Sequence, residues 1–393
     1  MQLERRARRM EKSAWIYICL TLGTVALALL IQKREVAPAC QKAGHAYGRW
    51  TPCTRRDALN RVTVFAIFCL LTAVSACRFA LGNDYWTYRE NFKRIFYDAH
   101  VSSEIGFNLV VKGLVALFGY DNYLPLFAVF SLLTVFFFIR AICDQGESFA
   151  FSLFLLLTGG YYFQSFNTIR YYLALAMAIY SMKYVLRREW GKFLLLILVS
   201  AAFHKTVLIV VPVFFVASYL ARTGLKKWHL IIAAIFAASL IFGQELYRWI
   251  IFRFYPFYEN TGFDVKHISY VNVAKCLGTL ALAAILFWER RKEEGERFTV
   301  AMRFYLWLNV FGLVAFLCGG FIPEVSRIGF YFIASQIFLI PDLARRIRGK
   351  WLGRVCKWGS ILAFSLYFVL LLKQMYQTDI RILPYMSWIF YYK

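Results

Sequence analysis

The sequence predicts an all-α, polytopic membrane protein with about eleven to twelve transmembrane or re-entrant helices. Hydrophobic residues make up 60% of the 393 residues, and they form long apolar runs along the whole chain. Clusters of Lys and Arg separate these runs, and they leave no room for a sizeable soluble domain. We therefore attribute the formal net charge of +24 to membrane topology and lipid headgroups, and we expect no nucleic-acid partner.

Three parts follow along the chain. Residues 1–61 hold an anchor helix over 14–31 and a basic loop, residues 62–373 form the polytopic domain, and 374–393 form a short tail. The expected segments of the polytopic domain are 62–81, 121–139, 148–163, 168–186, 193–203, 205–220, 229–247, 269–288, 299–318, 327–342 and 358–373.

Two of these regions are unusual. The runs 193–203 and 205–220 are each short for a perpendicular span, and His204 lies between them. They are either two tight passes or one broken, re-entrant hairpin, because irregular backbone is tolerated at membrane depth only where protein or water covers it. The run 105–119 is apolar but contains Asn108 and Lys112, which is typical of an interfacial or re-entrant helix.

The distribution of Lys and Arg gives the orientation. Loops 187–192, 222–227, 289–297 and 344–357 carry three, three, four and six basic residues, whereas 319–326 carries none. Because basic loops stay in the cytoplasm, residues 82–120 and 319–326 are expected outside. The same alternation leaves the basic residues 1–12 outside, against the rule, and translation from Met10 would remove most of their charge. A mass measurement of the N-terminus tests that hypothesis.

With this orientation, polar residues collect on the outer side. They are Asp84, Arg89, Glu104, Asn167, Arg170, His204, Asp264, His267, Glu324 and Arg327. Ionisable groups near the membrane are costly, so their convergence predicts a polar, outward-facing cavity.

Several of these residues also have a structural interpretation. Arg170 can reach the lipid headgroups, and Arg327 can pair with Glu324 at helical spacing. Asp84 can cap a turn, and Glu104 suits the first turn of a helix. His204 has little structural use between two apolar segments, so it is the strongest functional candidate.

Motifs of soluble chemistry are not found. The chain has no P-loop, no GxGxxG, no GxSxG and no metal-ligand spacing such as HExxH. We expect no cofactor and no metal. A reaction at the outer face would need an activated substrate that arrives on a lipid.

The chain resembles the EpsG-like family of bacterial exopolysaccharide and O-antigen (Wzy-type) polymerases. The resemblance rests on "GNDYWTY" at 82–88, "SEIGFNLV" at 103–110, "NTIRYYLALAMAIY" at 167–180, "FLLLILVSAAFHKTVLIVVPVF" at 193–214, and "SRIGFYF" at 326–332 before "LIPDL" at 339–343. Two departures stand out. Tyr171 stands where the family pattern has Gln. Phe203-His204 is followed by Lys205-Thr206, where the family pattern has Ser, and Thr206 keeps the hydroxyl.

The resemblance implies a GT-C-like or Wzy-like fold in the bacterial cytoplasmic membrane. It implies a glycosyltransferase that joins undecaprenyl-pyrophosphate-linked oligosaccharides on the outer face. Besides this substrate and membrane lipid, the partners it implies are a chain-length regulator and a flippase of the same pathway.

For this reaction we assign candidate roles to eleven residues. His204, Asp84 and Glu104 are the candidates for the base that takes the proton of the acceptor hydroxyl. We rank His204 first and Asp84 second. Arg170, Arg327 and Lys205 are expected at the pyrophosphate. The expected substrate-binding residues are Tyr85, Tyr88, Arg89, Asn167 and Thr206.

Other functions remain open at this point. A transporter of lipid-linked sugars would need polar residues near mid-span, and few are present. A membrane acyltransferase that modifies polysaccharide would need His204 reachable from the cytoplasm, whereas we expect it outside. A third alternative is a non-catalytic assembly partner of a polysaccharide synthesis complex.

Overall fold

The computed structural model describes residues 2–31, 55–97, 101, 103–224, 226–254, 268–289, 291, 298–322, 325–377 and 382–391. Within these ranges the regular elements are helices, so the all-α prediction is confirmed. They are α1 (Gln2–Leu29), α2 (Arg55–Ala76), α3 (Tyr85–Phe96), α4 (Ile105–Phe118), α5 (Leu124–Gln145), α6 (Phe149–Thr158), α7 (Tyr161–Gln164), α8 (Ile169–Leu186), α9 (Trp190–Ala201), the 3-10 helix η2 (Lys205–Ile209), α10 (Val210–Thr223), α11 (Lys227–Phe242), α12 (Gln244–Phe254), α13 (Tyr270–Glu289), α14 (Val300–Cys318), α15 (Val325–Ile333), α16 (Gln336–Arg346), α17 (Lys350–Gln377) and α18 (Trp388–Tyr391).

Six helices in the described residues are long and apolar enough to cross a membrane. They are α2, α5, the continuous segment Lys205–Thr223, α13, α14 and α17, and the bent pair of α15 and α16 makes a seventh. Four shorter apolar segments accompany them: Ser13–Leu29, Ile105–Phe118, Phe149–Thr158 and Trp190–Ala201. The chain is therefore a multi-pass membrane protein. The larger number expected from sequence also counted 14–31, 148–163 and 193–203 among the shorter segments, and the ranges 168–186 and 229–247 where α8 and α11 lie.

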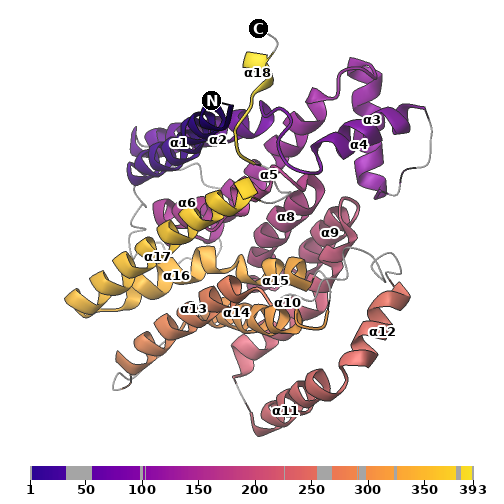
Figure 1. The fold of residues 1–393 in the computed structure, drawn as a ribbon. Coiled ribbons are helices and arrows are strands. Elements are labelled where there is room, and N and C mark those ends of the chain that lie inside the picture. Colours follow the sequence, from indigo (N-terminus) through magenta and orange to yellow (C-terminus); the bar gives the residue numbers. More distant parts are fainter. Residues whose placement is uncertain are drawn as a thin grey trace.

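Helix α8 forms the centre of the bundle (Figure 1). Every side chain from Tyr171 to Ile179 is buried, and α8 packs against α5, α9 and α10. Three alanines, Ala174, Ala176 and Ala178, keep its surface narrow, which lets neighbouring helices approach closely. In the same view α11 and α12 lie at the edge of the bundle.

The two ends of α8 differ in chemistry. Near its C-terminus, Lys183 pairs with Asp144 of α5 at 2.7 Å, close to the basic residues Arg187 and Arg188. Its first turn carries Arg170. With 18 residues, α8 is about 27 Å long, close to the thickness of a bilayer core. Arg170 and the basic end are thus separated by almost the full length of the helix.

Two expected spans are interrupted. Helix α9 ends at Ala201 and η2 begins at Lys205, so His204 lies in the break that the short apolar runs predicted. The segment 327–342, expected as one span, consists of two helices, α15 and α16, bent by 40°. Buried Ser335 lies at the break, and its hydroxyl donates a hydrogen bond of 2.8 Å to the Phe332 carbonyl, which also accepts from the Ser335 amide at 3.2 Å.

Backbone hydrogen bonds join the C-terminal segment to the residues that follow α2. The amide of Phe79 donates to the Met386 carbonyl at 2.8 Å, and the amide of Trp388 donates to the Cys77 carbonyl at 3.1 Å. The Tyr17 hydroxyl of α1 donates to the Ile382 carbonyl at 2.7 Å. This pairing holds α1, α2 and the C-terminal segment together next to the turn that leads to Asp84.

Candidate functional site

The first turn of α8 meets the turn after α2. The Asp84 amide donates a 3.2 Å hydrogen bond to Asn167 Oδ1, and the Thr168 hydroxyl donates one of 3.3 Å to Asp84 Oδ2. Gly82 permits this approach, because it has a φ of +85° and a Cβ there would lie 2.8 Å from the Asn167 Cα. A larger residue at position 82 would therefore collide with the backbone of Asn167.

Glu104 joins three segments of the chain. Its Oε2 accepts a hydrogen bond and ion pair from Arg170 Nη1 of α8. Its Oε1 lies 3.5 Å from His204 Nδ1 and accepts from the Lys205 amide at 3.4 Å. One carboxylate thus connects the start of α4, the start of α8 and the break before η2.

A second glycine makes this junction possible. The Gly106 amide donates to the Ala202 carbonyl at 2.7 Å, and a Cβ on Gly106 would lie 2.7 Å from that same oxygen. A carbon cannot occupy that position, so any larger residue would force α4 away from the end of α9. Glu104, two residues earlier, would then move away from His204.

We expect Gly106→Ala to lower the free energy of unfolding by about 1–3 kcal/mol because of this overlap. Gly113→Ala, on the same helix, is the matched control, since a Cβ there meets nothing within 4 Å. Thermal unfolding in detergent measures both. Equal melting temperatures for the two variants would contradict the steric role of Gly106.

The two carboxyl groups have opposite pKa shifts. Burial alone would raise the pKa of Glu104, but the hydrogen bond from His204 and the charge of Arg170 lower it to about 2. Burial raises the pKa of Asp84, and the positive charges of Arg327 and Arg170 only partly oppose this. Glu104 is therefore a fixed anion at neutral pH, whereas Asp84 is the more basic carboxylate.

Arg327, Thr206 and two tyrosines complete the cluster. The Tyr171 hydroxyl donates to the Arg327 carbonyl at 2.7 Å, and its ring contacts the His204 ring edge-on with 5.5 Å between centroids. Tyr331 also packs against Tyr171, and its hydroxyl lies 3.3 Å from Thr206 Oγ1. The Gln-to-Tyr departure at 171 thus places an aromatic ring beside the imidazole.

Aromatic rings flank Arg170. Its guanidinium carbon lies 5.3 Å from the centre of the Phe107 ring and 5.9 Å from that of Tyr88. These rings restrict the guanidinium, and one ion pair leaves several of its five N–H groups for other acceptors. Tyr88 itself is 3% exposed, so it supports Arg170 from within the protein.

Two expected substrate-binding residues lie away from the cluster. Tyr85 is 1% exposed and its ring stacks on Phe127 at 4.5 Å, which makes it a core residue. Arg89 places its guanidinium over Trp86 and Tyr123, at 5.4 and 5.2 Å. The structure thus assembles nine of the eleven candidates around the start of α8. Asp264, His267 and Glu324 lie outside the described residues.

Three residues near this site were not anticipated from the sequence. Tyr171 was noted only as a departure from the family pattern, although it directly follows Arg170, and Tyr331 was not singled out. Arg78 is almost fully buried, with its guanidinium between Phe127 and Phe166 and a hydrogen bond of 3.0 Å to Ser131. An Arg inside the expected span 62–81 was the signal that could have identified it.

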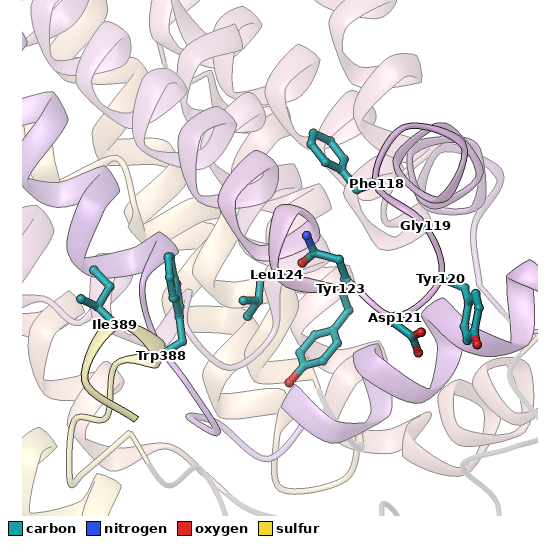
Figure 2. A pocket seen from close by; sticks show the side chains of 9 residues that line it. Phe118, Gly119, Tyr120, Asp121, Tyr123, Leu124, Trp388 and Ile389 are labelled. Carbon is teal, nitrogen blue, oxygen red and sulfur yellow. The ribbon is translucent and has the colours of Figure 1, made fainter. Parts of the chain in front are cut away.

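A large cavity lies apart from this cluster. It has a volume of about 690 Å³ and lies between the turn from α4 to α5 and the C-terminal segment. Figure 2 shows Tyr120, Asp121 and Tyr123 on one side, and Trp388 and Ile389 on the other. None of the nine clustered residues lines it. Among the described residues, no group of three or more His, Cys, Asp or Glu side chains could hold a metal ion.

Comparison with known proteins identifies a family. The model of the EpsG family matches residues 61–387, which is most of the chain and includes every residue of the cluster. No curated protein and no solved structure matches the chain significantly.

Proposed function

Because this chain belongs to the EpsG family, we propose that it is a membrane glycosyltransferase that polymerises polysaccharide repeat units. Its substrates are oligosaccharides linked to undecaprenyl pyrophosphate, and the reaction takes place on the outer face of the bacterial cytoplasmic membrane. The observation that carries the proposal is the convergence of Arg170, Arg327, Glu104, His204 and Asp84 at one end of α8.

The proposed reaction is a single displacement. The acceptor hydroxyl oxygen bonds to the anomeric carbon of the donor, while the bond from that carbon to the pyrophosphate oxygen breaks. The pyrophosphate lipid leaves with the electron pair, and the hydroxyl proton passes to the base. Fixed guanidinium groups stabilise the charge that develops on the leaving group.

We assign the base to His204. Its Nδ1 faces the permanently charged Glu104 at 3.5 Å, so this carboxylate can orient the ring and stabilise the imidazolium that forms. Nε2 is buried and has no hydrogen-bond partner among the described residues, so in this assignment the acceptor hydroxyl enters the site to reach it. Glu104 is then a positioning residue, and Asp84, with its raised pKa, is the competing base.

Arg170 and Arg327 are assigned to the pyrophosphate. Both charges act on Asp84, which supports their placement around one small region. Asn167 fixes the Asp84 backbone, while Thr206 and the exposed Lys205 side chain border the same region. In this assignment Tyr88 acts through Arg170 rather than on the sugar.

Reconstitution tests the activity. The purified chain in proteoliposomes is expected to elongate lipid-linked repeat units without added nucleotide or metal, and a ladder of products on a gel measures this. Acyl transfer to polysaccharide in place of elongation would favour the acyltransferase alternative. No elongation by the reconstituted, folded protein, with lipid-linked repeats of the native pathway, would reject the polymerase.

Cysteine labelling tests the orientation. Asp84→Cys and His204→Cys in a cysteine-free background are expected to react with an impermeant thiol reagent in intact spheroplasts. The control is Arg187→Cys, at the other end of α8, which is expected to react only after the membrane is opened. The reverse pattern would place the cluster in the cytoplasm and contradict the proposal.

A further inference from the structure

Two neighbouring cavities share part of their lining, and one of them lies beside the cluster. The first, of about 480 Å³, has a mixed lining, in which apolar and aromatic residues accompany the polar, uncharged side chains of Gln164, Ser269, Asn272, Ser326 and Gln374. The second, of about 390 Å³, runs along α13, α16 and α17. They share Val271 and Tyr367 as a common wall. We refer to them as the amide cavity and the apolar groove.

The apolar groove has the shape and polarity of a site for a lipid chain. Small residues open it: a Cβ on Gly278 or Gly359 would meet nothing within 4 Å. Apolar residues such as Leu282 and Val355 form its sides, and Val355 is 45% exposed on the surface of the bundle. A flexible hydrocarbon chain can therefore enter between the two membrane-spanning helices α13 and α17.

One charged residue lines this groove among the described residues. Lys275 places its ammonium 3.6 Å from the centre of the Tyr367 ring, and its Nζ is buried without a hydrogen-bond partner in the described part of the chain. A buried cation without an anion is costly at membrane depth. A phosphate group at the head of a lipid chain would supply the anion.

The amide cavity suits an uncharged glycan. Asn272 is 6% exposed, and its Oδ1 has no hydrogen-bond partner among the described residues, whereas its Nδ2 donates to Ser269 at 2.8 Å. Gln164 is held by a 2.5 Å hydrogen bond from the Tyr172 hydroxyl. Oriented amides and hydroxyls without charge are the groups that recognise sugar hydroxyls, and aromatic Tyr367 adds a surface for ring contact.

Helix α15 connects this cavity to the cluster. Ser326 and Phe330 line the amide cavity, while Arg327 between them belongs to the cluster. On α8, Tyr172 binds Gln164 of the cavity, and its neighbour Tyr171 binds the Arg327 carbonyl. A glycan that fills the cavity therefore lies next to the residues of α15 and α8 that contact the cluster.

We propose that the apolar groove and the amide cavity together bind the acceptor, a second lipid-linked glycan. Its isoprenoid chain lies in the groove along α13 and α17. Its phosphate pairs with Lys275, and its sugars occupy the amide cavity. The inference rests on the proposed function, because polymerisation needs two lipid-linked substrates, and the Arg170–Arg327 region is already assigned to the donor. It adds a second binding site, which includes Lys275 and Asn272, for the acceptor. The acceptor keeps its own lipid phosphate, which takes no part in the reaction.

Photo-cross-linking tests the groove without requiring turnover. The probe is a polyprenyl diphosphate with a diazirine in its isoprenoid chain, added to the full chain in nanodiscs. We expect labelled peptides from α13 and α17. Gly278→Leu fills the open space and is expected to reduce labelling about tenfold, as is Lys275→Met, which removes one charge-assisted contact. Gly23→Leu on α1, also with nothing within 4 Å of its Cβ, is the matched control.

The outcomes separate this inference from the proposed function. Labelling that Lys275→Arg restores, and that phosphatidylglycerol does not displace, supports the acceptor site. Labelling unaffected by Gly278→Leu, or equally displaced by phosphatidylglycerol, overturns it, because the groove would then hold bulk lipid. In the elongation assay Gly278→Leu and Lys275→Met are each expected to raise the KM for the lipid-linked acceptor about tenfold with kcat retained. Unchanged elongation would reject the acceptor site and leave the polymerase intact.

Discussion

Replacement of Arg170 by Met is expected to reduce elongation about a thousandfold. The guanidinium stabilises the charge on the departing pyrophosphate, and loss of one such fixed donor costs about 10²–10³ in kcat. The change also removes the ion pair that Glu104 makes at the start of α8. Arg170→Lys keeps the charge but loses the planar fork, so an intermediate activity is expected. Initial rates on lipid-linked repeats measure both variants.

A double variant distinguishes catalysis from folding. Arg170→Met alone leaves a partly buried carboxylate unpaired, which is expected to destabilise the protein. Adding Glu104→Gln removes that charge, so the double variant is expected to recover melting temperature but not elongation. Recovered elongation in the double variant would show that Arg170 serves only as the partner of Glu104, and the pyrophosphate assignment would then be wrong.

Replacement of His204 by Gln is expected to reduce elongation about 10²–10⁴-fold, the range for loss of a general base. Gln keeps polar contacts near Glu104 but cannot accept the proton. The pH–rate profile separates the two competing bases. The acid limb of the profile is expected to persist in Asp84→Asn and to disappear in His204→Gln.

The opposite pattern would identify Asp84 as the base. Its raised pKa means that protonation inactivates it at a higher pH than an ordinary carboxylate. Glu104, with a pKa of about 2, stays ionised throughout the measured range and gives no acid limb of its own. An acid limb that only Asp84→Asn abolishes would therefore contradict the assignment to His204.

Much of the fold and of the cluster could be predicted from local patterns. Apolar runs and basic loops gave the membrane helices and an orientation, and the orientation placed Asp84, Glu104, Arg170 and His204 on one side. The short runs around His204 predicted the break between α9 and η2. These features depend on hydrophobicity and charge, which each segment carries by itself.

The remaining features depend on contacts between distant segments. Tyr85 and Tyr88 are three residues apart in the same aromatic run, yet one stacks in the core and the other supports Arg170. The bend between α15 and α16 lies at Ser335 and Gln336, a polar pair inside a run that is apolar enough as a whole to suggest one span. The close approaches at Gly82 and Gly106 could not be predicted, because their partners Asn167 and Ala202 lie about ninety residues away.

The shared carboxylate of Glu104 has a consequence for evolution in this family. An Arg170 without Glu104, or a Glu104 without Arg170, leaves a partly buried charge uncompensated, so single replacements at either position pass through an unstable intermediate. The two positions are therefore expected to co-vary in divergent members, which keep both charges or lose both. Members that lack the pair would need a different way to hold the imidazole at the break before η2.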